Sequence, residues 1–418
     1  MEKSGKFRLT SLERNWILYD VGNSAFVLMV ATLIPIFFNA LAAAGGLSSV
    51  EYLAYWGYAS SAVTIITAVL SPILGTVADT KGFKKPIFIL CVFVGIVGCC
   101  AMGAASAWLP FLVIFVIAKV GFSGSLVFYD SMLSDVTTPE RMDEVSSRGY
   151  AWGYIGSCVP FVVCLGLVLG AGSIGISQMT ALNLALLLTA AWWLLTTLPL
   201  LKSYKQLYYV EVEKHAVRQS FVRIGHTLRH LPEDKQVFWF LLAFFCYIDG
   251  VYTIIDMATA YGTALGLDTT GLLLALLVTQ IVAFPSALIF GRLSNRYPSA
   301  KLIPVCIAAY AGIAVFAFFL TQQWQFWVLA VIVGMFQGGV QALSRSHFAK
   351  IIPPEKSGEY FGLFDICGKG ASFLGTMIVS VGSQLTGSAN VGVGSLIVLF
   401  IVGFVLFRVS CKKEVVSE

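Results

Sequence analysis

The sequence predicts an all-α polytopic membrane protein with twelve transmembrane helices in two six-helix bundles. Three observations support this fold class: the composition, the length of the apolar runs, and the placement of the basic residues. Hydrophobic residues make up 58% of the 418-residue chain and charged residues only 12%, with a mean hydropathy of +0.84. Soluble domains carry about 25% charged residues. The composition therefore excludes an ordinary soluble protein.

Twelve apolar segments are each about 20 residues or longer, as a hydrocarbon core of roughly 30 Å requires. We expect the first six spans at 15–41, 52–78, 86–106, 109–133, 147–170 and 178–201. We expect the other six at 236–262, 270–292, 302–320, 325–348, 359–384 and 390–408. The first segment is too long for the hydrophobic region of a signal peptide and contains Asp20 and Asn23, so we interpret it as a spanning helix.

Lysine and arginine lie on one side of these spans. The loops near 42–51, 107–108, 171–177, 263–269, 321–324 and 385–389 contain neither residue. The opposite loops contain Lys81, Lys84, Lys85, Arg141, Arg292, Arg296, Lys301, Lys350 and Lys356, and both termini are basic. Because basic loops stay in the cytoplasm, both termini are predicted to be cytoplasmic. The same rule explains the net charge of +5 without a nucleic-acid partner.

One long polar loop, 202–235, divides the chain into bundles 1–201 and 236–418. Its apolar residues recur at helical spacing, so an amphipathic helix on the membrane surface is one interpretation. The bundles also repeat. The segment that starts at Phe115 aligns without a gap with the one that starts at Ala330, which pairs Asp130 with Arg345. Such a repeat predicts two parallel, structurally equivalent halves.

The stretch "GTVADTKGFKKP" (75–86) resembles the signature loop of the major facilitator superfamily. Four further stretches resemble the "unknown major facilitator" family, whose fungal members are autophagy-related vacuolar amino-acid effluxers. They are "YDVGNSAF" (19–26), "VSSRGYAWGYIGS" (145–157), "FFCYIDGVYTI" (244–254) and "GGVQALSRSHFAKIIPPE" (338–355). The chain departs from the family at Val21-Gly22, where Trp-Ala is expected. The resemblance implies the major facilitator fold and a transport function.

Ionisable residues inside the spans are the candidates for substrate binding and proton coupling. A charge at mid-depth costs about 2.5–3.5 kcal/mol, so such residues usually face a cavity or one another. The set comprises Asp20, Lys119, Asp130, Asp249, Asp256, Arg345, Asp365 and Lys369. Acids outnumber bases in it, which predicts a carboxyl group that can take up a proton.

Asp249 is the leading candidate for proton coupling or amine binding, because it lies near the middle of the seventh span. The resemblance implies that spans one, four, seven and ten line the cavity. A structural bond from Asp249 to Lys119 or Lys369 is the alternative. Asp256 shares its helix face, about 10 Å further toward the outside. The other predicted binding residues are Asp20, Asn23, Tyr252, Gln337 and Gln341. For Asn23, a hydrogen bond that packs two helices is an equal alternative.

Arg345 has two interpretations. Its guanidinium could bind a substrate carboxylate while Asp249 binds the amine. Alternatively, as the register mate of Asp130, it could form an ion pair that closes the inner gate, which we prefer. In the signature loop, Asp79, Lys84 and Lys85 are expected to brace the halves when the inner side is shut. Gly75 and Gly82 belong to the same predicted gate.

The sequence therefore predicts a secondary active transporter that works by alternating access, is proton-coupled and exports amino acids or similar small zwitterions. No Walker-type motif is present, so ATP is not expected to drive it. An exporter or flippase of lipid-like or drug-like amphipathic molecules is the alternative, and a non-transporting ligand sensor is a third possibility. We expect no catalytic residues, cofactor or metal site. We expect a monomer whose partners are a small-molecule substrate, protons and the bilayer, in the plasma membrane if the chain is bacterial.

Overall fold

The computed structural model describes residues 7–211 and 216–412, except for some side chains within its helices. This part of the chain is helical and forms no β-strand, only one isolated bridge between Thr80 and Val210. Eleven of its helical segments are long and apolar enough to cross a membrane. The predicted all-α membrane fold is confirmed.

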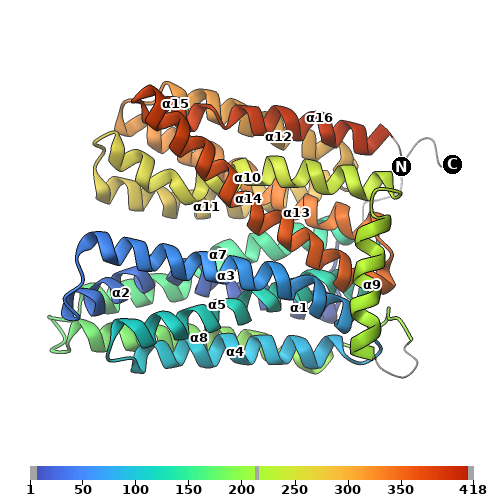
Figure 1. The fold of residues 1–418 in the computed structure, drawn as a ribbon, viewed down its shortest axis with the longest axis horizontal. Helices are drawn as coiled ribbons and strands as arrows, with labels where there is room; N and C mark the ends of the chain where they lie inside the picture. The colour runs from blue at the N-terminus through green and yellow to red at the C-terminus, as the bar shows by residue number, and fades with distance from the viewer. Residues whose placement is uncertain (1–6, 212–215, 413–418) are drawn as a thin grey trace.

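The first half comprises α1 to α8, which lie together on one side of the molecule (Figure 1). Its helices are α1 (Ser11–Ala31), α2 (Leu33–Ala44), α3 (Ser49–Ala78), α4 (Lys84–Ala104), α5 (Trp108–Ser131), α6 (Leu133–Val136), α7 (Met142–Leu169) and α8 (Gln178–Ser203). The second half lies beside it. Its helices are α10 (Lys235–Ala264), α11 (Thr269–Leu293), α12 (Ser299–Phe318), α13 (Gln323–Ile351), α14 (Ser357–Thr386), α15 (Ala389–Gly394) and α16 (Ile397–Lys412), with a short 3₁₀ turn at Pro354–Lys356. This arrangement supports the proposed division into bundles 1–201 and 236–418.

Eleven of the twelve predicted spans coincide with the eleven apolar segments. The remaining one, predicted at 359–384, corresponds to α14, whose residues 369–373 have no described side chains. The count of twelve spans therefore stays a prediction.

Local sequence signals explain where several helices begin and break. Thr10 and Glu13 form a capping box that starts α1, since each side chain accepts a hydrogen bond from the other's backbone N–H. The first span is interrupted at Thr32, between α1 and α2. Pro35 explains this break, because it has no N–H to donate to the carbonyl of Ala31 and its ring crowds that carbonyl.

A helix is present in the polar loop: α9 (Ala216–His230) runs across the ends of both halves, nearly perpendicular to the long helices (Figure 1). Arg223 on α9 donates a hydrogen bond to the carbonyl of Thr76 in α3. Its Nε also lies 3.6 Å from a carboxylate oxygen of Glu359 in α14. The helix therefore bridges the two halves at this end. The start of α1 and the end of α16 lie at the same end (Figure 1), which we call the inner end.

Candidate functional site

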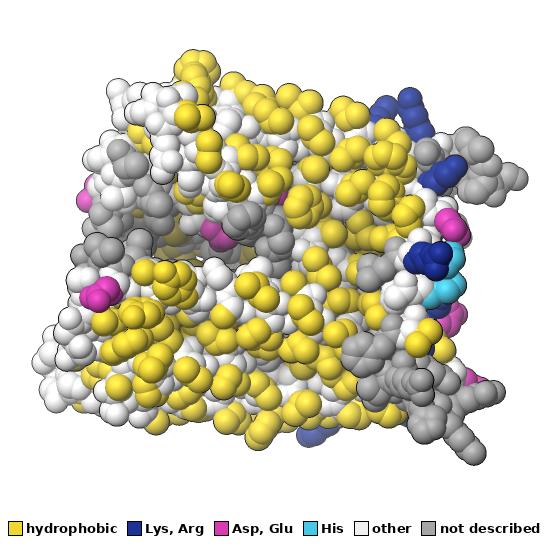
Figure 2. Space-filling view, in the orientation of Figure 1, with side chains coloured by type: hydrophobic (Ala, Val, Ile, Leu, Met, Phe, Trp, Pro, Cys, Tyr) yellow, Lys and Arg dark blue, Asp and Glu magenta, His cyan; other side chains and the backbone are white. Residues whose placement is uncertain are grey.

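A cavity of about 690 Å³ lies between the two halves. Figure 2 shows the molecule hollowed between its halves, toward the end away from α9. The lining of the cavity includes Trp56 and Ser60, from the first part of α3. The cavity therefore extends toward the end opposite the inner end, which we call the outer end. Polar lining residues come from both halves. They include Asp20, Asn23, Lys119, Tyr129, Asp130, Tyr150 and Tyr154 from the first, and Tyr252, Asp256, Gln280, Gln337, Gln341, Arg345 and Asp365 from the second. The structure thus brings together most of the predicted binding residues.

Lys119 and Asp256 present opposite charges to this cavity from opposite halves. Lys119 lies on α5 and Asp256 lies on α10. The ammonium group and the carboxylate attract each other electrostatically. The ammonium group of Lys119 also lies 4.6 Å from the ring centre of Phe122 and 6.0 Å from that of Phe26. Such cation–π contacts hold an ammonium group in place. The cavity therefore offers an oppositely charged side chain to each end of a zwitterion.

Asp249 does not line this cavity, contrary to the expectation from the sequence. It is 0% exposed, and it accepts hydrogen bonds from the backbone N–H of Gly375 (2.9 Å) and from Thr253 Oγ1 (3.3 Å). A side chain at position 375 would begin 2.6 Å from Oδ1 of Asp249, so the glycine lets α14 approach the carboxylate. In this conformation Asp249 ties α10 to α14, because α14 covers α10 at this carboxylate.

Lys369 lies on α14, but its side chain is outside the described residues. Asp365, one turn earlier, lines the cavity and accepts a hydrogen bond from Ser71 Oγ at 2.7 Å. Ser71 lies on α3, so this bond also joins the two halves.

The predicted ion pair between Arg345 and Asp130 is present at the inner end of the cavity. Nη1 of Arg345 lies 3.0 Å from Asp130 and 3.9 Å from Asp20. Nε donates to Ser146 Oγ at 2.9 Å, and Nη2 donates to the carbonyl of Ser146 at 3.0 Å. The side chain is 2% exposed. Since each of these guanidinium nitrogens already has a partner, Arg345 has no free fork for a substrate carboxylate here, and the geometry supports the gate interpretation.

Three aromatic rings of the first half surround the same guanidinium. Its central carbon lies 4.7 Å from the ring centre of Trp16, 5.3 Å from that of Tyr129 and 4.4 Å from that of Tyr150. All three distances are within the range of cation–π attraction. We call this set, with Asp20, Asp130 and Ser146, the Arg345 pocket.

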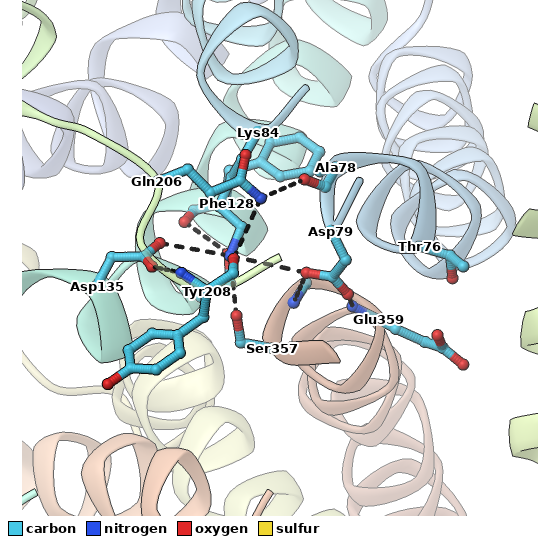
Figure 3. Close-up of polar contacts among 12 residues, drawn as sticks. Thr76, Ala78, Asp79, Lys84, Phe128, Asp135, Gln206, Tyr208, Ser357 and Glu359 are labelled. Carbon is cyan, nitrogen blue, oxygen red and sulfur yellow. Dashed lines mark hydrogen bonds and ion pairs between the residues drawn. The ribbon is translucent and has the colours of Figure 1, made fainter. Parts of the chain in front are cut away.

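A second contact between the halves is built by the signature loop (Figure 3). Asp79 accepts hydrogen bonds from the backbone N–H groups of Gly358 (2.7 Å) and Glu359 (2.8 Å) at the start of α14. The first N–H groups of a helix have no partner within it and attract negative charge. Burial raises the pKa of the Asp79 carboxyl to about 6, although the nearby charge of Lys84 lowers it. Asp79 therefore caps a helix of the other half.

Lys84 completes this contact. Its ammonium group is fully buried, donates to Ser357 Oγ at 2.9 Å, and lies 3.7 Å from Asp79 and 3.6 Å from Asp135. Lys85 does not brace the halves, contrary to expectation. It donates to the carbonyl of Tyr204 at 3.5 Å, just beyond α8 of its own half. Successive lysines of a loop point in different directions, so only one of them faces the other half.

The two glycines of the loop have different roles. The Cα of Gly75 lies so close to the backbone of Gly358 that a methyl group there would collide with the carbonyl oxygen of Gly358. Close approach of α3 and α14 therefore requires glycine. Gly82 has φ of +78°, a left-handed conformation that glycine adopts without strain. Its N–H donates to Gln206 Oε1 at 3.0 Å, so it serves the loop rather than the contact between halves.

Sequence reasoning missed a third contact, between α7 and the second half. Asp143 accepts a hydrogen bond from Ser346 Oγ at 2.6 Å and pairs with Lys350 at 2.6 Å. Asn295 donates to Glu144 at 2.6 Å. The internal repeat could have predicted the contact of Asn295, because aligning residues 75–85 with 291–301 places Asn295 at the position of Asp79. Together these three contacts join the two halves at the inner end.

Comparisons with known proteins agree with this architecture. A family described as "Vacuole effluxer Atg22 like" matches residues 11–415. The "Uncharacterized MFS-type transporter YxiO" of Bacillus subtilis (strain 168) is 43% identical over 96% of this chain and 94% of its own length. Autophagy-related protein 22 of Coccidioides immitis (strain RS) is 26% identical over 64% of this chain and 51% of its own length. The matched region thus spans about half of that fungal relative.

Solved structures share the fold at low sequence identity. The human organic anion transporter MFSD10 (TETRAN) superposes with a TM-score of 0.72 at 14% identity, covering 94% of this chain and 99% of its own. A bacterial homologue of the iron transporter ferroportin, in an outward-facing state, gives 0.67 at 15% identity, covering 96% and 98%. From family, relatives and fold together, this chain belongs to the vacuole effluxer Atg22-like family and is a multi-pass membrane transporter with the major facilitator fold.

Proposed function

We propose that the protein is a proton-coupled secondary active transporter that works by alternating access and exports amino acids or similar small zwitterions. The observation that carries the proposal is the pair of opposite charges, Lys119 and Asp256, on opposite walls of one cavity. Lysine suits a substrate carboxylate, and aspartate suits a substrate ammonium group. Because each half contributes one charge, a bound zwitterion would draw the halves together.

The distribution of contacts supports alternating access. Charged and polar groups join the halves at the inner end, whereas the cavity extends toward the outer end. Polar contacts that involve only a few residues can break and form again as two rigid halves rock about a central site. With the predicted cytoplasmic termini, the open side faces away from the cytoplasm. We infer that transport requires the Asp79 and Arg345 contacts to break in each cycle.

Two features support proton coupling. Asp20 and Asp130 share the single guanidinium of Arg345, so a second positive charge is needed to neutralise both carboxylates. Asp249 is buried, and its Oδ2 has no hydrogen-bond partner among the described residues. A buried carboxylate oxygen that accepts no hydrogen bond is a position at which a proton can bind. We propose these acids as proton carriers, and the family description as an effluxer supports export.

Counterflow of a labelled amino-acid mixture in proteoliposomes tests the proposal. Wild type should accumulate label, while Asp256→Asn and Lys119→Gln should each lose at least about 90% of the exchange, since a lost charged hydrogen bond is worth about 1.5–3 kcal/mol. Asp249→Asn is the matched control, because Asp249 lies on the same helix as Asp256 but outside the cavity. It should still exchange and should lose only accumulation against a pH gradient. Accumulation of no amino acid by wild type would contradict the proposal.

A second candidate function is export of amphipathic molecules. The observation that favours it is the aromatic part of the cavity wall. It comprises Trp56, Phe115, Phe122, Phe244 and Phe364. Rings of this kind stack well on flat apolar ligands. Uptake of ethidium into inverted vesicles, with no amino-acid counterflow, would favour this function over the first.

A further inference from the structure

The Arg345 pocket is a cation-binding site that belongs entirely to the first half. Its rings and polar groups lie on α1, α5 and α7, whereas Arg345 comes from α13 of the second half. The pocket combines two carboxylates, a serine carbonyl and hydroxyl, and three ring faces at 4.4–5.3 Å. Recognition of alkylammonium and guanidinium ligands uses this same combination of rings and anions.

Opening of the inner end must empty this pocket. Arg345 is anchored on the other half, so it withdraws when the halves separate at α7 and α13. Asp20, which is buried, and Asp130, whose side chain is 20% exposed, would then lose their cation. Removing one partner of a buried ion pair is strongly destabilising, because it leaves an uncompensated charge. The inward-open conformation therefore needs a replacement for the charge of Arg345, either another cation in the pocket or protons on the carboxylates.

We propose that the replacement is the cationic group of the substrate, a guanidinium or primary ammonium at the end of a side chain, so that the protein carries cationic amino acids and related guanidines. The proposal rests on the proposed transport function and names its substrate class. Asp20, Tyr129, Asp130 and Tyr150 all line the cavity, so a ligand in the pocket is continuous with that space. Arg345 then acts as an internal mimic of the substrate.

The exchange of cations couples release of the substrate to closure of the inner end. The substrate's cation enters the pocket from the cytoplasmic side while the inner end is open. When the inner end closes, Arg345 returns and displaces that cation into the cavity, which is open to the outside. Binding and release are thereby separated by the same movement that seals the inner end, as export requires.

Equilibrium binding to the purified full-length protein in nanodiscs tests the proposal. The probes are L-arginine and L-citrulline, which have similar length but differ in charge, guanidinium against neutral urea. Arg345→Gln should bind arginine at least about tenfold more tightly than wild type does, because the competing guanidinium is gone. It should also prefer arginine over citrulline by at least about tenfold. Adding Tyr150→Leu to this variant should remove most of that preference.

Lys350→Gln is the matched control. Lys350 also extends from α13 to an acid of the first half, Asp143, but it does not line the cavity. Loss of Lys350 should weaken the contact between the halves but leave Arg345 in its pocket. The affinity of Lys350→Gln for arginine should therefore be less than about threefold above that of wild type. An equal gain in Lys350→Gln and Arg345→Gln would show that gate opening alone explains the effect, and it would overturn the proposal.

Four other outcomes decide the matter. If Arg345→Gln binds arginine and citrulline alike, or neither, protons neutralise the vacated carboxylates and the proposal is wrong. If this variant does not fold, wild-type counterflow of labelled arginine replaces it, and competition by agmatine but not citrulline is expected. If wild type exchanges neutral amino acids but not arginine, the substrate class is wrong while the proposed function stands. If Arg345→Gln binds arginine selectively but wild type exchanges no amino acid, the pocket stands and the transport proposal falls.

Discussion

The signature loop and its copy in the second half make the same kind of contact with different chemistry. In the first half, Asp79 accepts two backbone hydrogen bonds at the start of α14, with Lys84 beside it. In the second half, the equivalent Asn295 donates one hydrogen bond to Glu144 near the start of α7. The loop keeps its position between helix ends in both halves. In the first contact the acidic residue belongs to the loop, whereas in the second contact it belongs to the helix.

This difference indicates which of the two contacts contributes more to keeping the inner end closed. Asp79 and Lys84 are both fully buried, so neither can exchange its partner for water. Glu144 also pairs with Arg148 at 2.5 Å, and this arginine is partly exposed. Loss of Asn295 therefore leaves Glu144 with another partner. Loss of Asp79 leaves two helix N–H groups without a partner and removes one of the two carboxylates beside the buried ammonium group of Lys84. We expect the first contact to carry more of the seal.

The largest expected effect comes from Asp79→Ala. Truncation of one partner of a buried, hydrogen-bonded charge pair costs about 3–5 kcal/mol. The sealed conformation should therefore lose its dominance, and net transport should fall at least about tenfold. Solvent accessibility of a cysteine introduced at Ser357, in a background without the native cysteines, measures the opening. A variant that stays closed to thiol reagents there would contradict the assignment.

A steric change should have the next largest effect. Gly75→Ala places a methyl group against the carbonyl of Gly358, and the backbone on both sides must shift. Gly291→Ala, the equivalent change in the second half, places its methyl 2.8 Å from Cβ of Ser147, a longer distance than the one from position 75 to the carbonyl oxygen of Gly358, so a smaller backbone shift is needed. We expect Gly75→Ala to impair export severalfold more than Gly291→Ala. Export rates of the two variants, normalised to folded protein, check this order.

Acidification should stabilise the sealed conformation relative to the open one. The pKa of Asp79 is about 6 in the sealed conformation, against about 3.9 for a solvated aspartate. The sealed conformation therefore binds a proton there more tightly, and its relative stability should rise as pH falls from about 6 to about 4. The groups that face this carboxyl are Lys84 and Glu359. Conformer populations measured at pH 7 and pH 5 should show the rise in wild type but not in Asp79→Asn.

The smallest expected effect comes from Asn295→Ala. It removes one hydrogen bond, worth about 0.5–1.5 kcal/mol or somewhat more to a charged acceptor. Transport should fall no more than about threefold. Asn295→Asp sharpens the comparison, because it places a second negative charge beside Glu144 and should weaken this contact further. An Asn295→Ala variant as damaged as Asp79→Ala would show that the two contacts are equivalent.

The sequence predicted contacts that follow from the repeat and missed those that depend on helix packing. Aligning the halves paired Asp130 with Arg345, and the structure joins them at 3.0 Å. The same alignment could have found Asn295 and Glu144. Asp249 was misplaced because the resemblance identifies which spans line the cavity, and the 3.6-residue period shows which side chains share a face, but neither shows which helix covers that face. Here Gly375 lets α14 cover the carboxylate, while Asp256 remains in the cavity.

The central claim is that Asp79 and its partners hold the inner end closed while the cavity is open outward. Spin labels at Lys81 and Glu355, exposed residues of opposite halves, would measure the distance across this end by double electron–electron resonance. The account predicts one short distance in wild type without substrate, and a second, longer population in Asp79→Ala that Asn295→Ala shows only weakly. A long distance in wild type, unchanged by Asp79→Ala, would contradict it.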